Sequence, residues 1–122
     1  MRVAGIGFRR DASLAALEQA LSLAEAQGGR ADALATHADK AGADVLLALA
    51  RARNLPVHGV AVRGVATPTQ SARVAALHGT GSLAEAAALV AAGPTARLTV
   101  ARVTAPDGMA TAAIAETTGE GT

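Results

Sequence analysis

The first apolar run of the chain is Val3-Ala4-Gly5-Ile6-Gly7-Phe8, and the basic pair Arg9-Arg10 follows it directly. A short apolar run without polar interruptions indicates a strand buried on both faces. Such strands are typical of parallel sheets that are covered by helices. Ser13 is suited to cap a helix in which leucines recur at every third or fourth position, and Gly28-Gly29 ends that helix. The opening therefore predicts the strand-then-helix order of an α/β fold.

The rest of the chain continues this alternation of strands and helices. The expected elements are a strand at 33–36, a helix at 44–54 capped by Asp44, a strand at 57–62, a helix that begins at Thr67-Pro68, a helix after the capping box Ser82–Glu85, and strands at 98–103 and 109–115 around the turn Pro106-Asp107-Gly108. This order predicts the α/β class. We expect a three-layer α/β/α sandwich around a mixed, mostly parallel sheet of about five strands, with a C-terminal antiparallel hairpin.

Length and composition limit the kind of protein. The 122 residues suit one domain, which we expect at residues 1–116, followed by a flexible tail at 117–122. The chain has no cysteine, so disulfides and thiolate sites are excluded. The formal net charge is +1, the basic residues are scattered, and Phe8 is the one aromatic residue. We expect no nucleic-acid partner, because such proteins usually show a basic stripe and stacking aromatics.

No segment of the sequence predicts a membrane association. The first residues lack a signal-peptide pattern, and no apolar stretch is long enough to span a bilayer. We therefore expect no membrane partner and a cytoplasmic location.

The end of the first strand is the leading candidate site. Gly5-Ile6-Gly7 matches part of the dinucleotide-binding fingerprint, but Arg10 stands where the fingerprint needs its third glycine. A nucleotide-binding module therefore stays an alternative. The leading interpretation is that Arg9 and Arg10 meet at the carboxyl edge of the sheet, where open α/β folds bind ligands and where arginine pairs with carboxylates or phosphates. A solvent-exposed turn beside tightly packed glycines is the other interpretation.

Two further segments are compatible with an anion site. Gly79-Thr80-Gly81-Ser82 precedes a helix, whose first amides favour anions, although Ser82 and Glu85 could simply cap each other. Lys40 is the one lysine of the chain and follows the second strand. Its alternative role is that of a surface charge beside Asp39, which contributes little to stability.

The sequence shows no recognisable catalytic set. His37, His58 and His78 lie about twenty residues apart, a spacing that does not favour a metal site. Ser71 and Ser82 have no evident partners for a hydrolase triad. We expect no metal and no cofactor, and the catalytic residues stay unassigned.

The same segments resemble the CobE/CbiG C-terminal domain family of cobalamin biosynthesis. The similarity extends in order over nearly the whole chain. It rests on the opening at residues 5–10 with its Ser-led helix, and on residues 36–40, 66–71, 79–89 and 111–115. Phe8 and Arg102 depart from the family pattern, since a small residue or cysteine is frequent at the first position and a lysine is common at the second. A cysteine-based role for the opening motif is therefore not implied.

The resemblance implies a stand-alone CobE-like protein that binds or carries a precorrin- or hydrogenobyrinate-type intermediate of the aerobic pathway. The alternative from another class is a CbiG-like hydrolase that acts on a precorrin ring lactone. Corrin precursors are flat apolar rings edged with carboxylates, which suits a basic sheet edge. Other cobalamin-pathway enzymes, such as methyltransferases, are the further partners that we expect. The expected ligand-binding residues are Gly7, Arg9, Arg10, Lys40, Thr67, Ser71, Gly79, Gly81 and Ser82.

Overall fold

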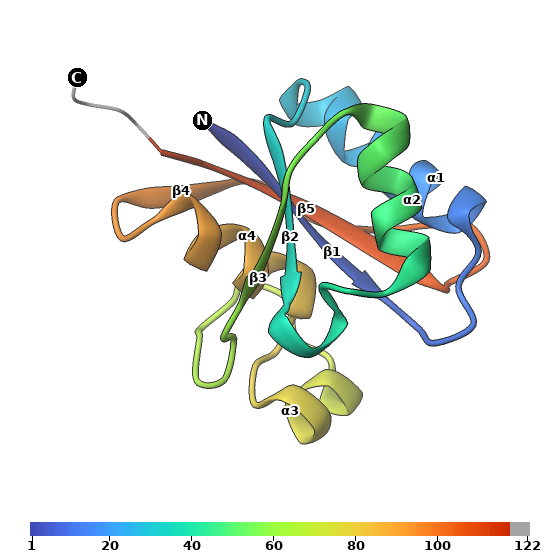
Figure 1. The fold of residues 1–122 in the computed structure, drawn as a ribbon. Helices are drawn as coiled ribbons and strands as arrows, with labels where there is room; N and C mark the ends of the chain where they lie inside the picture. The colour runs from blue at the N-terminus through green and yellow to red at the C-terminus, as the bar shows by residue number, and fades with distance from the viewer. Residues whose placement is uncertain (118–122) are drawn as a thin grey trace.

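A five-stranded sheet in the order β3-β2-β1-β5-β4 forms the middle layer of the protein (Figure 1). The structure, a computed structural model, describes residues 1–117 except for the side chains of Arg73, Leu77 and His78. The elements along the chain are β1 (Arg2–Phe8), α1 (Leu14–Gly28), β2 (Ala33–His37), the short 3₁₀ helix η1 (Ala38–Lys40), α2 (Asp44–Arg53), β3 (Val57–Val60), α3 (Ala72–His78), α4 (Leu83–Ala92), β4 (Ala96–Thr104) and β5 (Ala110–Thr117).

The central strand of the sheet is β1. It is parallel to β2, which is parallel to β3, and it pairs antiparallel with β5 along its whole length. Since β4 is antiparallel to β5, β5 alone runs against the other four strands. The predicted mixed, mostly parallel sheet with a C-terminal hairpin is confirmed.

Helices cover both faces of the sheet, as the sequence predicts. α1 and α2 pack on one face and α4 packs on the other, while α3 lies beyond the end of the sheet (Figure 1). Successive residues of β1 point to opposite faces. Ile6 therefore joins the apolar cluster under α1 and α2, and Val3 joins the cluster under α4.

The backbone of α4 lies directly on β1 at Gly5. A Cβ atom placed on Gly5 would come 1.9 Å from the carbonyl oxygen of Ala84 and 2.7 Å from the amide nitrogen of Ala88. The face that α4 turns to the sheet is made largely of small side chains, because Ala84, Ala87 and Ala88 are all fully buried. Only a glycine on the strand and alanines on the helix allow this separation.

Glu85 of α4 is fully buried, and its carboxylate forms hydrogen bonds that hold two irregular segments against the helix. Its Oε1 accepts hydrogen bonds from the backbone amide (3.0 Å) and the hydroxyl (2.8 Å) of Thr69, and its Oε2 accepts from the Arg102 amide at 2.8 Å. Half of the expected capping box is present, since Ser82 Oγ accepts from the Glu85 amide at 3.4 Å. The other half would be a hydrogen bond from the Ser82 amide to the Glu85 carboxylate. Here the carboxylate binds Thr69 and Arg102 instead.

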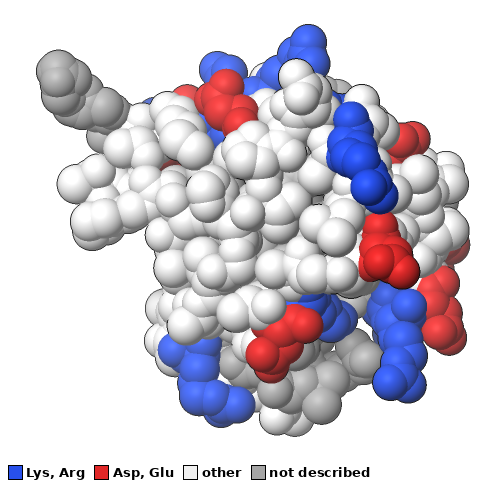
Figure 2. All heavy atoms as spheres, viewed as in Figure 1, with Lys and Arg blue, Asp and Glu red and all other residues white. Residues whose placement is uncertain are grey.

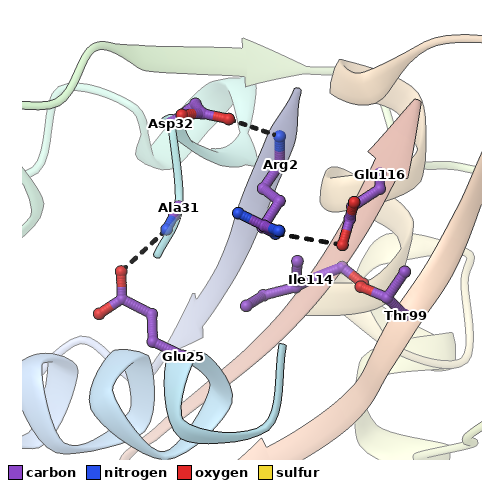
Figure 3. A network of polar contacts seen from close by, with 7 residues as sticks. All are labelled: Arg2, Glu25, Ala31, Asp32, Thr99, Ile114 and Glu116. Carbon is purple, nitrogen blue, oxygen red and sulfur yellow. Dashed lines mark hydrogen bonds and ion pairs between the residues drawn. The ribbon is translucent and has the colours of Figure 1, made fainter. Parts of the chain in front are cut away.

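Charged side chains hold the amino end of β1 (Figure 3). The Arg2 amide donates to Asp32 Oδ2 at 2.8 Å, and the Arg2 guanidinium pairs with Glu116 Oε2 at 3.1 Å. Nearby, Glu25 Oε2 accepts from the Ala31 amide at 2.9 Å. One ion pair and two hydrogen bonds from backbone amides to carboxylates thus connect β1, β5, the end of α1 and the segment before β2.

Several element boundaries differ from the predictions. The third helix does not begin at Thr67-Pro68 but at Ala72, with Ser71 as its N-cap, because Glu85 holds the preceding segment through Thr69 in a non-helical form. Asp44 is the first residue of α2 and not its cap, which is Ala43. β3 ends at Val60, two residues early. Of the predicted tail, Thr117 ends β5 and residues 118–122 lie outside the described residues.

Replacing Gly5 by alanine is expected to destabilise the protein by about 3 kcal/mol, because the new methyl group would meet helix backbone and not a movable side chain. Urea unfolding of the variant measures this loss. Gly42→Ala is the matched control, since a Cβ at Gly42 meets nothing within 4 Å and should change stability by about 0.5 kcal/mol at most. Equal stability of the two variants would contradict the described packing of α4.

Replacing Glu85 by glutamine is expected to cost about 2–3 kcal/mol, because the amide group can accept on one side only and leaves a buried N–H without an acceptor. The same change at Glu18, a partly exposed residue of α1, is the control and should alter stability by about 0.5 kcal/mol or less. Thermal unfolding of both variants makes the comparison. An unchanged Tm in Glu85→Gln would show that the carboxylate contributes nothing to holding the two segments.

Candidate ligand-binding site

A small hollow of about 140 Å³ lies where β1 ends. Segments that are far apart in the sequence form its walls: the last residues of β1, the end of η1, the start of α3, the start of α4, the outer part of β4 and the hairpin. The lining residues are Gly7, Phe8, Arg9, Lys40, Ser71, Val74, Leu83, Arg102, Gly108, Met109, Ala110 and Thr111.

Four of the residues expected from the sequence meet in this hollow: Gly7, Arg9, Lys40 and Ser71. Gly7 has to be small, because an added Cβ would come 2.7 Å from Thr111 Oγ1. The backbone of Arg9 is fixed by donation to the Met109 carbonyl at 2.9 Å, and its side chain is exposed. The strand order predicts that these residues meet at the carboxyl edge of β1, and four of the expected residues do meet there.

Lys40 is held over the end of β1. Its ammonium group donates to the Phe8 carbonyl oxygen and lies 4.8 Å from the centre of the Phe8 ring. A cation above an aromatic face is attracted by the ring's quadrupole. These contacts place the one lysine and the one aromatic residue of the chain together at the wall of the hollow.

The charges around the hollow are all of one sign among its described lining residues: Arg9, Lys40 and Arg102 are cationic, and the others carry no charge. Three cations from three different elements favour an anionic ligand, because arginine and lysine donate charge-assisted hydrogen bonds to carboxylates and phosphates. Over the wider surface, Figure 2 shows acidic and basic side chains interspersed around the margin of the face drawn, with a broad uncharged area between them.

Arg102 is a lining residue that the sequence-based site did not include. Simple alternation along β4 would place it on the same face as Val100, which belongs to the core under α1. The register of β4 with β5 shifts between Val100 and Val103, and Val103 packs against that same core. The extra residue turns Arg102 to the opposite face, where its amide meets Glu85. The odd spacing of the two valines is the sequence signal for this bulge.

Arg10 lies outside the first hollow and lines a neighbouring, more open one of about 610 Å³. That second hollow lies beside the start of α2. Its lining residues are Phe8, Arg10, Ala12, Asp39, Lys40, Gly42, Ala43, Asp44 and Val45.

The other expected site residues shape the segment behind the first hollow and do not line it. Thr67 donates through Oγ1 to the Thr69 carbonyl at 2.8 Å. Gly79 ends α3 with φ +71°. Gly81 packs against the Gln70 side chain, and Ser82 is fully buried as the N-cap of α4.

Within the described part of residues 1–117, no group of three or more His, Asp or Glu side chains is placed to hold a metal ion. His37 Nδ1 accepts from the Asp39 amide at 3.2 Å, and the side chain of His78 lies outside the described residues. None of the helices in this part of the chain is long and apolar enough to cross a membrane.

Comparison with known proteins identifies the family. The family model described as cobalamin synthesis G C-terminus matches residues 2–115. The crystal structure of CobE, a protein from the cobalamin (vitamin B12) biosynthetic pathway, is 32% identical, with a TM-score of 0.81 over 94% of this chain and 92% of that one. No curated protein matches significantly.

A second solved structure agrees. The cobalamin biosynthesis protein chiG from Agrobacterium tumefaciens is 37% identical, with a TM-score of 0.73 over 98% of this chain and 100% of that one. Both matches span almost the full length of each protein, and their identities are high enough to show more than a shared fold. The chain therefore belongs to the cobalamin synthesis G C-terminus family of cobalamin biosynthesis proteins.

Proposed function

We propose that this protein is a cytoplasmic carrier that binds a corrin-ring intermediate bearing several carboxylates and passes it to another enzyme of the aerobic cobalamin pathway, such as a methyltransferase. The observation that carries the proposal is the convergence of Arg9, Lys40 and Arg102 on one hollow at the sheet edge. These side chains come from separate elements, so the fold itself assembles the cationic wall.

The lining chemistry fits such a ring. The carboxylates at the ring edge would pair with the two guanidinium groups and the ammonium group. Phe8, Leu83 and Met109 supply apolar surface for the ring body, and the hydroxyls of Ser71 and Thr111 supply further hydrogen bonds. Cations, hydroxyls and apolar surface are the groups that hold a polycarboxylate ring in place, and this supports binding as the role of the site.

The size of the hollow supports reversible binding of the ring edge. Its volume of about 140 Å³ is below the roughly 300–1,000 Å³ of pockets that enclose a whole small molecule. The hollow would therefore hold the acidic edge and leave part of the ring uncovered. An uncovered ring is accessible to the next enzyme, which is what a carrier requires.

Titration of the purified protein with a corrin-type polycarboxylate that still carries the ring lactone tests the proposal. The ligand is followed by its visible absorbance, because amino-acid side chains do not absorb in that range. A saturable spectral shift, with the mass of the recovered ring unchanged, is the result expected of a carrier. A ring of altered mass would instead support the hydrolase alternative, and a spectrum that does not respond would contradict both.

Arg102→Ala and Arg9→Ala should each raise the Kd for the ring about 10- to 100-fold, since a hydrogen bond to a charged group contributes roughly 1.5–3 kcal/mol. The Arg102 variant keeps the backbone amide that binds Glu85, so its fold should be intact. Arg97→Ala is the control, because Arg97 is an exposed cation at the other end of β4. If Arg97→Ala weakens binding as much as the other two changes, general charge attraction and not the hollow explains the affinity.

A further inference from the structure

We propose that the second hollow is part of the same binding site, so that one flat polycarboxylate ring extends from the first hollow, past Phe8 and Lys40, to the start of α2. This inference rests on the proposed function for the class of ligand. It adds where the body of the ring lies.

The two hollows share a wall. Phe8 and Lys40 line both of them, and these two side chains are in direct contact. Both hollows also lie along the same edge of the sheet, since Arg9 and Arg10 follow β1 and Lys40 follows β2. A ligand whose edge occupies the first hollow therefore meets the second one immediately beyond the Phe8–Lys40 contact.

The charges of the two hollows differ in strength. The first has three cations and no acidic residue among its described lining residues. In the second, Arg10 and Lys40 are balanced by Asp39 and Asp44. Carboxylates surround the whole rim of the ring, and the first hollow attracts those that reach it more strongly than the second does. The first hollow thus anchors the ring, and Arg10 is the cation that faces carboxylates on the part of the rim over the second hollow.

The second hollow offers apolar surface for the remainder of the ring. Ala12, Ala43 and Val45 line it together with Phe8. Its volume of about 610 Å³ lies inside the usual range for small-molecule sites, which the first hollow alone does not reach. Together the two hollows are large enough for a macrocycle. The first supplies cations that bind its carboxylates, and the second supplies apolar surface against which the ring can pack.

Gly42 provides a way to block the second hollow selectively. It lines that hollow and not the first, and an added Cβ meets nothing within 4 Å. A large side chain can therefore enter the space without a clash at its root. In Gly42→Trp, the Kd for the corrin polycarboxylate should rise about tenfold or more, which corresponds to a loss of about 1.4 kcal/mol. Arg97→Trp, which puts the same side chain on an exposed position outside both hollows, should bind within about twofold of wild type, a difference of roughly 0.4 kcal/mol.

The same variant gives an independent readout, because its indole is the one tryptophan of the chain. Energy transfer from an indole to the bound ring falls steeply with distance, so the ring should quench Gly42→Trp more strongly than Arg97→Trp. Wild-type affinity in Gly42→Trp, with quenching no stronger than in Arg97→Trp, would overturn the inference and leave the proposed function standing. An equal loss of affinity in the two variants would also overturn it, because filling the hollow would then not be the cause. No binding by the wild-type protein would instead refute the proposed function itself.

Discussion

The direct contact between the backbone of α4 and Gly5 of β1 is the constraint on which the rest of the structure depends. With the helix this close to the sheet, Glu85 lies beneath the irregular segments on both sides of α4. Its carboxylate then binds the Thr69 amide on one side and the Arg102 amide on the other. These two attachments position the segments that carry Ser71 and Arg102, both of which line the first hollow. A wider separation of α4 from β1 would move the Glu85 carboxylate away from these segments.

Burying a carboxylate costs free energy, but hydrogen bonds offset that cost at the position of Glu85. Segments without regular structure leave backbone amides that need acceptors. Glu85 satisfies two such amides and the Thr69 hydroxyl with one side chain. The carboxylate is thereby solvated by fixed donors, which lowers the cost of its burial. The result is a wall set before the ligand arrives, so less ordering has to accompany binding.

Local patterns predicted much of this fold, and long-range contacts decided the rest. β1, the helix after Ser13 and the C-terminal hairpin follow from apolar periodicity and turn residues close in sequence. The predicted start of α3 was wrong because Thr69 is hydrogen-bonded to Glu85, sixteen positions away. No sequence pattern near Pro68 indicates that contact. Arg102 was missed for a related reason, since its face depends on a bulge in β4. Strand order, by contrast, was enough to bring Arg9 and Lys40 to one edge.

Our proposal makes the carboxyl edge of the sheet a cationic, preformed binding site for the acidic rim of a corrin ring. The lining residues favour an anionic ligand with apolar surface, and membership of a cobalamin biosynthesis family is the reason why we propose a corrin-type ring. A crystal structure of the protein with a corrin polycarboxylate tests it most directly. The account predicts ring carboxylates within hydrogen-bond distance of Arg9, Lys40 and Arg102. A ring bound elsewhere, such as at the end of the sheet near Arg2 and Glu116, would contradict it.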